Sequence, residues 1–221
     1  MKIDVFTDPK YAHLYGENFP RPQPSDFAVS YFNETENLIF IDIGANDGIT
    51  CSNSLPFEIN YNWKGLCIEP HPVAYSKLIT NRNCTCLNYA VSENEMELDF
   101  LVIEGKAEML SGLVKDYHPD HIQRIKRETE ANGDKVYVQK VISKSLPQLL
   151  KENNIAKVNY LSIDTEGSEF SIIKGIDFNI VDIDLVSIEV NYDITPFNEI
   201  MKYNGYTFLE KVCTDAFYCK K

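Results

Sequence analysis

Residues 38–48, LIFIDIGANDG, form an apolar run that ends in an aspartate and a loop bearing two glycines. A near-continuous apolar run of this length is typical of a strand buried on both faces of a parallel sheet. Gly44 removes the side chain where a ligand would meet the backbone, and Gly48 permits a tight turn into a following helix. The stretch therefore predicts the first strand of a parallel sheet, with a ligand-binding loop at its carboxyl end.

Short apolar runs alternate with helical patterns along the rest of the chain. Further strands are predicted at residues 65–68, 85–91, 158–163 and 184–190, and helices at 71–81, 146–153 and 168–174. Residues 96–103 and 135–142 alternate like solvated antiparallel strands, and residues 206–213 and 216–219 indicate a terminal hairpin around Thr214-Asp215. This order predicts an α/β fold: a doubly wound, Rossmann-like, mostly parallel sheet that ends in an antiparallel hairpin.

The first 36 residues are expected to form an N-terminal arm, and the domain proper is expected to span residues 37–221. The arm shows no sustained periodicity, and the prolines of residues 20–24 cannot continue a helix or join a central strand. Its aromatic side chains Tyr11, Tyr15 and Phe19 could cover a ligand, although packing onto the domain is the simpler role.

The chain of 221 residues is acidic, with 33 Asp and Glu against 21 Lys and Arg and a formal net charge of −12. This balance argues against nucleic acid or an anionic membrane as the main partner, because both attract basic surfaces. No apolar run approaches the roughly 18 residues of a membrane span, and no signal-peptide pattern is present. We therefore expect a cytoplasmic protein without membrane insertion. The six cysteines lack zinc-type spacing and are expected to be reduced.

A carboxylate, Glu69, ends the second predicted strand and precedes Pro70. Ligands of open α/β sheets bind just beyond the carboxyl ends of the strands, where Glu69 could accept hydrogen bonds from both hydroxyls of a ribose. The alternative is an acid that complements a helix N-terminus. The glycine loop at the end of the preceding strand favours the ribose.

Other polar residues follow the later strands. Asn88 and Ala90 lie at the end of the third strand, where an adenine would lie, and Asn88 could bond either the base or neighbouring backbone. Asp164 and Glu166 precede a glycine turn after the fourth strand, and Glu189 ends the next one. Asp164 is the strongest functional candidate, because burial near other acids is costly without a cationic or protic partner.

Taken together, these motifs resemble the FkbM family of S-adenosylmethionine-dependent methyltransferases, mostly O-methyltransferases of sugars and related hydroxylated metabolites. The resemblance spans about residues 38–213 and rests on DIGANDG, IEPHP, LNYAVS, LSIDTEGSE and SIEVN, in this order. The D-x-E-G-x-E element is its most specific part. The resemblance implies a class I methyltransferase fold and S-adenosylmethionine as the cofactor.

Cofactor-binding roles follow from this resemblance. It implies that the cofactor lies against Asp42, Gly44, Ala45, Asn46, Gly48, Asn53, Glu69, His71, Asn88, Ala90 and Asp164. Within this set the glycine loop would line the methionine end, Glu69 would hold the ribose, and the residues from Asn88 would border the adenine. Many members have a lysine where Ser162 stands, so no role for that lysine carries over. The acidic rim suits the cofactor, which carries a sulfonium and an ammonium but no phosphate.

Methyl transfer to a hydroxyl requires a base, because an alcohol is a weak nucleophile near neutral pH. The candidates are Asp164, Glu166, Glu189 and His118, of which Asp164 is preferred. His118 lies on a long insertion that could close over the acceptor, but an exposed loop histidine is ordinarily only solvated. A divalent metal held by the three carboxylates is a less favoured alternative, because histidine ligands are scarce.

We therefore expect an O-methyltransferase whose acceptor is a sugar or glycan, either fused to glycosyltransferases or cooperating with them. Two alternatives stay open. A nicotinamide-dependent oxidoreductase could use a related sheet, although the loop spacing D-x-G-x-x-x-G is not G-x-G-x-x-G. A binding module that has kept the fold without the chemistry is the other, because fold does not establish activity.

Overall fold

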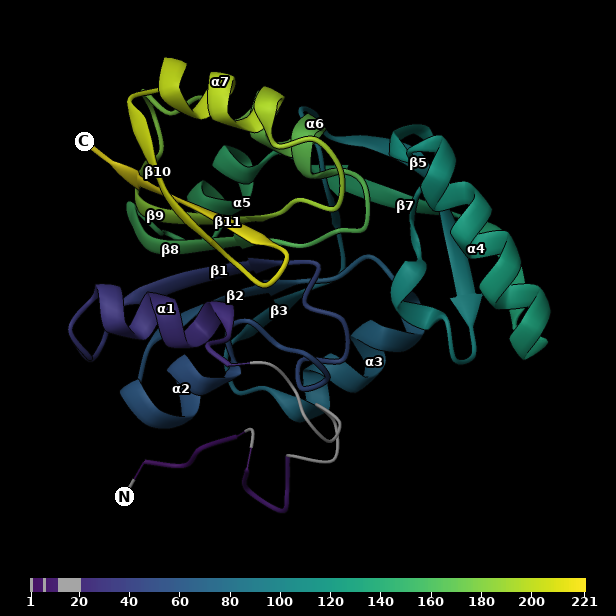
Figure 1. The fold of residues 1–221 in the computed structure, drawn as a ribbon, viewed down its shortest axis with the longest axis horizontal. Coiled ribbons are helices and arrows are strands. Elements are labelled where there is room, and N and C mark those ends of the chain that lie inside the picture. The colour runs from purple at the N-terminus through teal and green to yellow at the C-terminus, as the bar shows by residue number, and fades with distance from the viewer. Residues whose placement is uncertain (1, 6, 12–20) are drawn as a thin grey trace.

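A sheet with strand order β10-β11-β9-β8-β1-β2-β3 forms the centre of the protein (Figure 1). The computed structural model describes residues 2–5, 7–11 and 21–221. The strands are β1 (Ile39–Ile43), β2 (Lys64–Ile68), β3 (Thr85–Leu87), β8 (Lys157–Ile163), β9 (Asp182–Glu189), β10 (Tyr206–Val212) and β11 (Asp215–Lys220). The first five of these pair in parallel, and β11 pairs antiparallel with β9 and with β10. The predicted α/β class, mostly parallel sheet and terminal antiparallel hairpin are confirmed.

Helices cover both faces of this sheet. Figure 1 shows α5 (Leu146–Glu152), α6 (Glu169–Gly175) and α7 (Thr195–Tyr203) above the strands, and α1 (Pro24–Tyr31), α2 (Leu55–Tyr61) and α3 (Pro72–Asn81) below them. Alternate residues of β1 explain this arrangement: Ile41 and Ile43 join the core under α5 and α6, whereas Phe40 joins the opposite core with α1 and α2. No helix of the described residues is long and apolar enough to cross a membrane.

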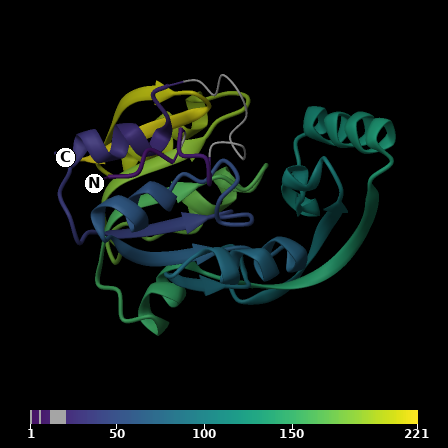
Figure 2. The ribbon, with the colours of Figure 1, turned by 90° about the horizontal axis from the view of Figure 1, so that it is seen from below.

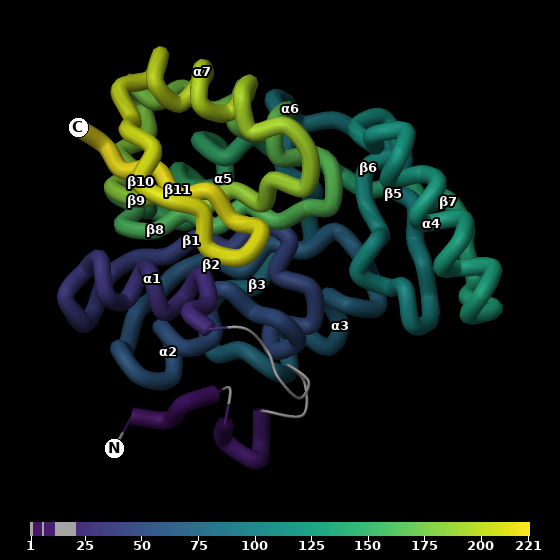
Figure 3. Tube along the Cα trace, viewed as in Figure 1, coloured from purple at the N-terminus to yellow at the C-terminus, as the bar shows by residue number. Residues whose placement is uncertain are grey.

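A smaller sheet with strand order β4-β7-β5-β6 extends from the edge near β3. It contains β4 (Ala90–Val91), β5 (Met96–Glu104), β6 (Gly112–Leu113) and β7 (Lys135–Lys144), with α4 (Pro119–Asn132) and the short 3-10 helices η2 (Glu108–Leu110) and η3 (Val114–Asp116) between its strands. Figure 2 shows β5, β7 and α4 projecting beyond the main sheet, and Figure 3 shows β6 beside β5. The antiparallel pairing of β5 with β7 follows the alternation predicted for residues 96–103 and 135–142.

The strand predicted at residues 85–91 is wrong as a single element, because it divides into β3 of the main sheet and β4 of the smaller one. The break falls at Asn88. Its side-chain amide donates to the carbonyl oxygens of Glu69, at 2.8 Å, and Pro70, at 3.2 Å. These bonds tie the chain to the end of β2 while it passes from one sheet to the other.

Residues 24–31, which we assigned to an arm, form the helix α1 and pack against the main sheet. Ala28 is fully buried, and the Phe27 ring lies 4.3 Å from that of Phe217 on β11. Pro24 starts the helix, where its missing N–H is not needed. From the sequence, we expected these prolines only to interrupt a helix or a strand. Tyr11 packs with Val5 and Leu55, while Tyr15 and Phe19 lie outside the described residues, so a covering role for the arm stays a prediction.

Phe57 is central to the core below the sheet. Its fully buried ring stacks on Trp63, with 4.4 Å between centroids, and meets Tyr160 of β8 edge-on at 5.2 Å.

We predict that Phe57→Ala lowers the free energy of unfolding by about 3–5 kcal/mol, because it leaves a cavity between the sheet and α2. Urea denaturation measures this change. Ile180→Ala, at a side chain that is 72% exposed, is the matched control and should change stability by less than about 0.5 kcal/mol.

Candidate functional site

The carboxyl ends of β1, β2 and β8 surround a cavity with about 860 Å³ of empty space, counted to its open mouth. The cavity brings together residues that are far apart in the sequence. Of the residues predicted from the sequence, it is lined by Asp42, Gly44, Ala45, Asn46, Asn53, Glu69, His71, Ala90, Asp164 and Glu166.

The glycine loop after β1 is shaped by its contact with β8. Gly44 has a φ of +88°, and a Cβ there would lie 1.6 Å from the carbonyl oxygen of Asp164. Gly44 is therefore required because two backbone segments meet at this point. From the sequence, we expected instead that a ligand would meet the backbone here. Gly48, with a φ of +80°, faces α3 instead of the cavity, since its Cβ would lie 2.6 Å from side-chain atoms of Leu78 and Arg82.

Glu69 is held in the cavity wall by backbone groups. One carboxylate oxygen accepts the N–H of Asn46 at 2.8 Å, and the other accepts the N–H of His71 at 2.7 Å. Burial raises the pKa of Glu69 to about 7, although these two hydrogen bonds oppose the shift. Each carboxylate oxygen can accept a further hydrogen bond. The carboxylate is thus fixed in place with acceptor capacity left for a hydroxylated ligand.

His71 joins the two sheets at this point. Its Nδ1 accepts the N–H groups of Val73 and Ala74, both at 3.2 Å, and so caps α3. Nε2 then carries the proton and donates to the carbonyl oxygen of Ile103 on β5, also at 3.2 Å. His71 lines the cavity in which the cofactor is expected, and it also has a structural role that the sequence did not indicate.

The structure does not bring Asn88 to the cavity. Its amide nitrogen is used by the carbonyl oxygens that tie the chain to β2, and the neighbouring residues Tyr89, Ala90 and Val91 form the wall on this side. The geometry therefore agrees with the second possibility that the sequence left open for Asn88, a bond to neighbouring backbone.

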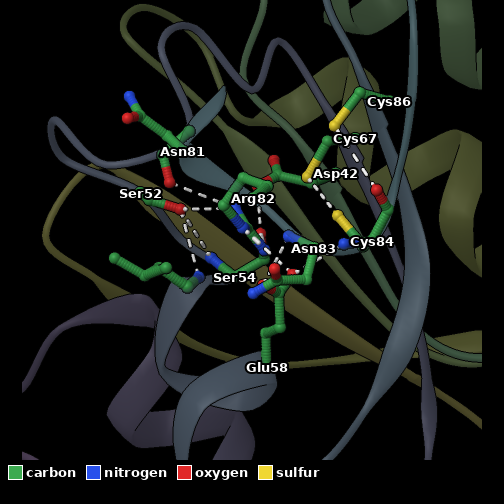
Figure 4. A network of polar contacts seen from close by, with 12 residues as sticks. Asp42, Ser52, Ser54, Glu58, Cys67, Asn81, Arg82, Asn83, Cys84 and Cys86 are labelled. Carbon is green, nitrogen blue, oxygen red and sulfur yellow. Dashed lines mark hydrogen bonds and ion pairs between the residues drawn. The ribbon is translucent and has the colours of Figure 1, made fainter. Parts of the chain in front are cut away.

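Asp42 supports the loop from beneath. The residue is 3% exposed, and its carboxylate accepts a hydrogen bond from the hydroxyl of Ser54 (Figure 4). Burial raises the pKa of Asp42, while the Ser54 hydroxyl and the charge of Arg82 oppose this shift. Asp42 also lines the cavity in which the cofactor is expected, and its bond with Ser54 anchors the segment before α2.

A buried arginine, Arg82, organises the far side of the same segment (Figure 4). Its guanidinium donates to the carbonyl oxygen of Gly48 and to Ser52 Oγ, both at 3.3 Å, and to Ser54 Oγ at 3.1 Å. It also forms an ion pair with Glu58 at 3.2 Å. Arg82 could not be found from the sequence, because nothing in the pattern around it indicates contact with residues 28–34 positions earlier.

Three of the predicted acids meet in space. Carboxylate oxygens of Asp164, Glu166 and Glu189 all lie within 4.8 Å of one another. Burial and mutual repulsion raise the pKa of Glu166 and of Glu189 to about 8, and raise that of Asp164 well above its usual value. One oxygen of Glu166 and one of Glu189 are buried without a hydrogen-bond partner. The group, called here the acid trio, can accept protons, bind hydroxyl donors or hold a divalent cation.

Two further buried acids lie near the trio. Glu169 accepts the N–H of Thr165 at 2.8 Å and that of Gly167 at 3.1 Å, so it stabilises the turn before α6. Asp215 of β11, which is 2% exposed, pairs in register with Glu189. Like Glu166 and Glu189, it has a buried oxygen without a hydrogen-bond partner, and burial raises its pKa to about 7. Asn53 donates to Ser162 Oγ at 3.3 Å.

His118 lies away from the first cavity. It caps α4 by accepting the N–H of Asp120 at Nδ1, at 3.2 Å, and its ring stacks on Tyr192 with 4.1 Å between centroids. With Nδ1 used as an acceptor, the neutral ring carries its proton on Nε2 and has no free lone pair. The candidate base His118 is therefore poorly suited to that role in this conformation.

A profile of the FkbM methyltransferase domain matches residues 42–210. Because the match covers well over half of the chain, the protein belongs to the FkbM methyltransferase family. It is an S-adenosylmethionine-dependent methyltransferase, as the resemblance implied. Among the described residues that line it, the cavity offers the fixed carboxylate of Glu69 and further acids but no Lys or Arg, which fits a cationic cofactor without phosphate.

Solved structures show likeness of fold at low identity. A methyltransferase FkbM from Methylobacillus flagellatus KT is 13% identical, with a TM-score of 0.46, and the match covers 96% of this chain and 58% of that one. A precorrin-6y C5,15-methyltransferase from Geobacter metallireducens GS-15 is 12% identical, with a TM-score of 0.42 and coverage of 88% and 84%. A SAM-dependent methyltransferase from Aquifex aeolicus is 10% identical, with a TM-score of 0.43 and coverage of 99% and 97%. No curated protein sequence matches the chain.

We predict that Glu69→Ala weakens binding of S-adenosylhomocysteine by about 1–3 kcal/mol, because charged hydrogen bonds to the ribose are lost. Isothermal titration calorimetry measures the change, with Glu36→Ala, an exposed acid before β1, as the control. Since the pKa of Glu69 is about 7, wild-type affinity should fall from pH 8 to pH 6 as the carboxylate is protonated. Unchanged affinity in Glu69→Ala would remove the ribose assignment.

The acid trio also predicts how stability depends on pH. Glu166 and Glu189 have folded pKa values near 8 against 4.5 for ordinary glutamate. The folded state therefore binds more protons than the unfolded state, and the free energy of unfolding should fall as pH rises from about 4.5 to about 8. Urea denaturation at several pH values should show Glu189→Gln reducing this fall by on the order of 1–3 kcal/mol. Identical pH slopes in the two proteins would contradict the raised pKa values.

Proposed function

We propose that the protein transfers a methyl group from S-adenosylmethionine to a hydroxyl of a sugar or glycan. The observation that carries this proposal is the position of the acid trio at the junction of two cavities. Glu166 lines both the cavity described above and a second one, which Glu189 also lines, whereas Asp164 lines the first. Carboxylates at such a junction lie between the place for a cofactor and the place for an acceptor.

Two groups of residues would hold the cofactor. Glu69 would accept the ribose hydroxyls, and the loop from Gly44 to Asn46 would border the methionine end near Asp164. When bound, S-adenosylmethionine supplies an electrophilic methyl carbon on a positively charged sulfur. The acids of the cavity favour this positive charge, and the fixed backbone of the loop limits the orientations open to it.

The base in this proposal is Asp164. A carboxyl group whose pKa is raised by burial and by neighbouring acids is a stronger base than an ordinary aspartate, and it can take the hydroxyl proton as the new bond forms. Glu166 and Glu189 share the same space and can pass the proton onward. A cationic centre close by would favour the ionised form of Asp164 and so prepare it to accept the proton.

The sugar class of acceptor draws support from the family resemblance and from charge. A net charge of −12 disfavours a nucleic-acid acceptor, since phosphate backbones attract basic surfaces. A hydroxylated, uncharged acceptor meets no such repulsion. We extend the proposal to a cytoplasmic setting and to glycosyltransferases as fused or cooperating partners that would supply the glycan.

We predict that Asp164→Asn retains S-adenosylhomocysteine binding within about threefold but loses at least about a hundredfold in turnover, the usual range for removal of a general base. The assay follows transfer of radiolabelled methyl from S-adenosylmethionine to a panel of sugars. Asn179→Asp, on a surface turn, controls for a charge change elsewhere.

Full turnover by Asp164→Asn would assign the base to another residue. Absence of transfer to every sugar, with cofactor binding intact, would contradict the acceptor class. Repeating the assay with EDTA tests the cation alternative, because loss of activity that Mg²⁺ restores would show the acid trio to be a metal site.

A further inference from the structure

The second cavity adjoins the first and contains about 830 Å³ of empty space, counted to its mouth. Its walls come from the start of α4, the turn before α6 and the segment after β9. Side chains of two kinds line it. The aromatic ones include Tyr117, His118, Phe170 and Tyr192, and the acidic ones include Glu166 and Glu189.

Tyr192 forms a supported aromatic wall of this cavity. It follows β9, while His118 belongs to the insertion that carries α4, and the two rings stack with an interplanar angle of 26°. Tyr192 is still 48% exposed, so much of its ring borders the cavity and solvent. Because His118 is itself held by the N–H of Asp120, the ring of Tyr192 has a fixed neighbour on one face. Phe170, which is 38% exposed, adds apolar surface.

The acidic part of the cavity needs hydrogen-bond donors. Glu166 and Glu189 each have a buried oxygen without a hydrogen-bond partner, and a buried acceptor left without a hydrogen bond is destabilising. The Glu166 oxygen has only longer contacts, with His121 at 3.8 Å and Arg124 at 4.0 Å. Burial and mutual repulsion raise the pKa of both groups to about 8. The direction of these shifts favours the protonated, uncharged forms, so the cavity is less anionic than its acid count implies. The acceptor oxygens without hydrogen-bond partners favour a ligand that brings hydroxyl donors.

We propose that the second cavity is the acceptor subsite, in which a sugar ring packs its C–H face on Tyr192 and directs a hydroxyl towards Glu166 and Glu189. A sugar offers both surfaces that the cavity matches: an apolar face for an aromatic ring and hydroxyl donors for carboxyl oxygens. The inference rests on the proposed function and assigns it a binding residue, Tyr192, that no sequence motif identified.

The subsite is consistent with a balanced transfer. The sugar oxygen forms a bond to the methyl carbon while the bond between that carbon and the cofactor's sulfur breaks, and the sulfur keeps the electron pair. The hydroxyl proton passes to an ionised carboxylate of the acid trio. Tyr192 and His118 take no part in these bonds, so they act as binding and positioning residues.

The experiment uses the full chain and the methyl α-pyranosides of D-glucose, D-mannose and D-galactose as probes. Saturation-transfer NMR of the protein loaded with S-adenosylhomocysteine detects binding, and radiolabelled S-adenosylmethionine detects transfer. We expect Tyr192→Ala to raise KM for an accepted glycoside at least tenfold and to leave S-adenosylhomocysteine affinity within twofold. Tyr192→Phe should behave like the wild type, and so should Tyr203→Ala, a control at a side chain that is 91% exposed on α7.

A second variant tests whether His118 only supports the ring of Tyr192 or also takes part in proton transfer. If His118 only steadies Tyr192, His118→Ala should raise KM by a few-fold and leave kcat unchanged. A large fall in kcat at constant KM would show instead that His118 handles the proton, and would overturn its assignment as a positioning residue.

The outcomes separate this inference from the proposed function. Transfer with a KM that Tyr192→Ala leaves unchanged would overturn the subsite and keep the O-methyltransferase. Binding that depends on Tyr192 without transfer would support the subsite and contradict the proposed function. Glycosides that neither bind nor react, with cofactor affinity intact, would overturn the subsite.

Discussion

The close approach of two backbones, the loop after β1 and the end of β8, is the constraint on which the site depends. Gly44 can lie against the carbonyl oxygen of Asp164 only because it has no Cβ, which would stand 1.6 Å away. This contact places the loop expected to border the cofactor beside the acid expected to act as base. A larger residue would separate the two strand ends, and the cavity and the acid trio would no longer share a wall.

The buried acids around this contact fall into two groups that differ in their hydrogen bonding. Asp42 and Glu69 receive hydrogen bonds from Ser54 and from backbone N–H groups, so their burial is compensated and the cavity wall is rigid. Glu166 and Glu189 instead each keep a buried oxygen without a hydrogen-bond partner. These unbonded oxygens lower the stability of the protein at the residues that we propose to transfer protons. Such a loss of stability is common at functional sites.

The central strands could be predicted because a strand buried on both faces has a nearly continuous apolar sequence, such as the run from Ile39 to Ile43. The division of residues 85–91 between two sheets could not, since it depends on bonds from Asn88 to carbonyl oxygens at the end of another strand. Helix α1 was missed for a related reason: its buried face is defined by Phe217, near the other end of the chain. Arg82 gives no local signal at all.

The sequence by itself determined the class of fold, the order of strand ends and the kinds of group on them, because apolar periodicity and loop composition are local properties. It also carried the family, through motifs that keep their order. Only the tertiary structure decided which acids meet, why Gly44 is needed, that His71 ties the sheets together, and that His118 stacks on Tyr192. Each of these depends on distances between segments remote in the chain, which the packing of strands and helices sets.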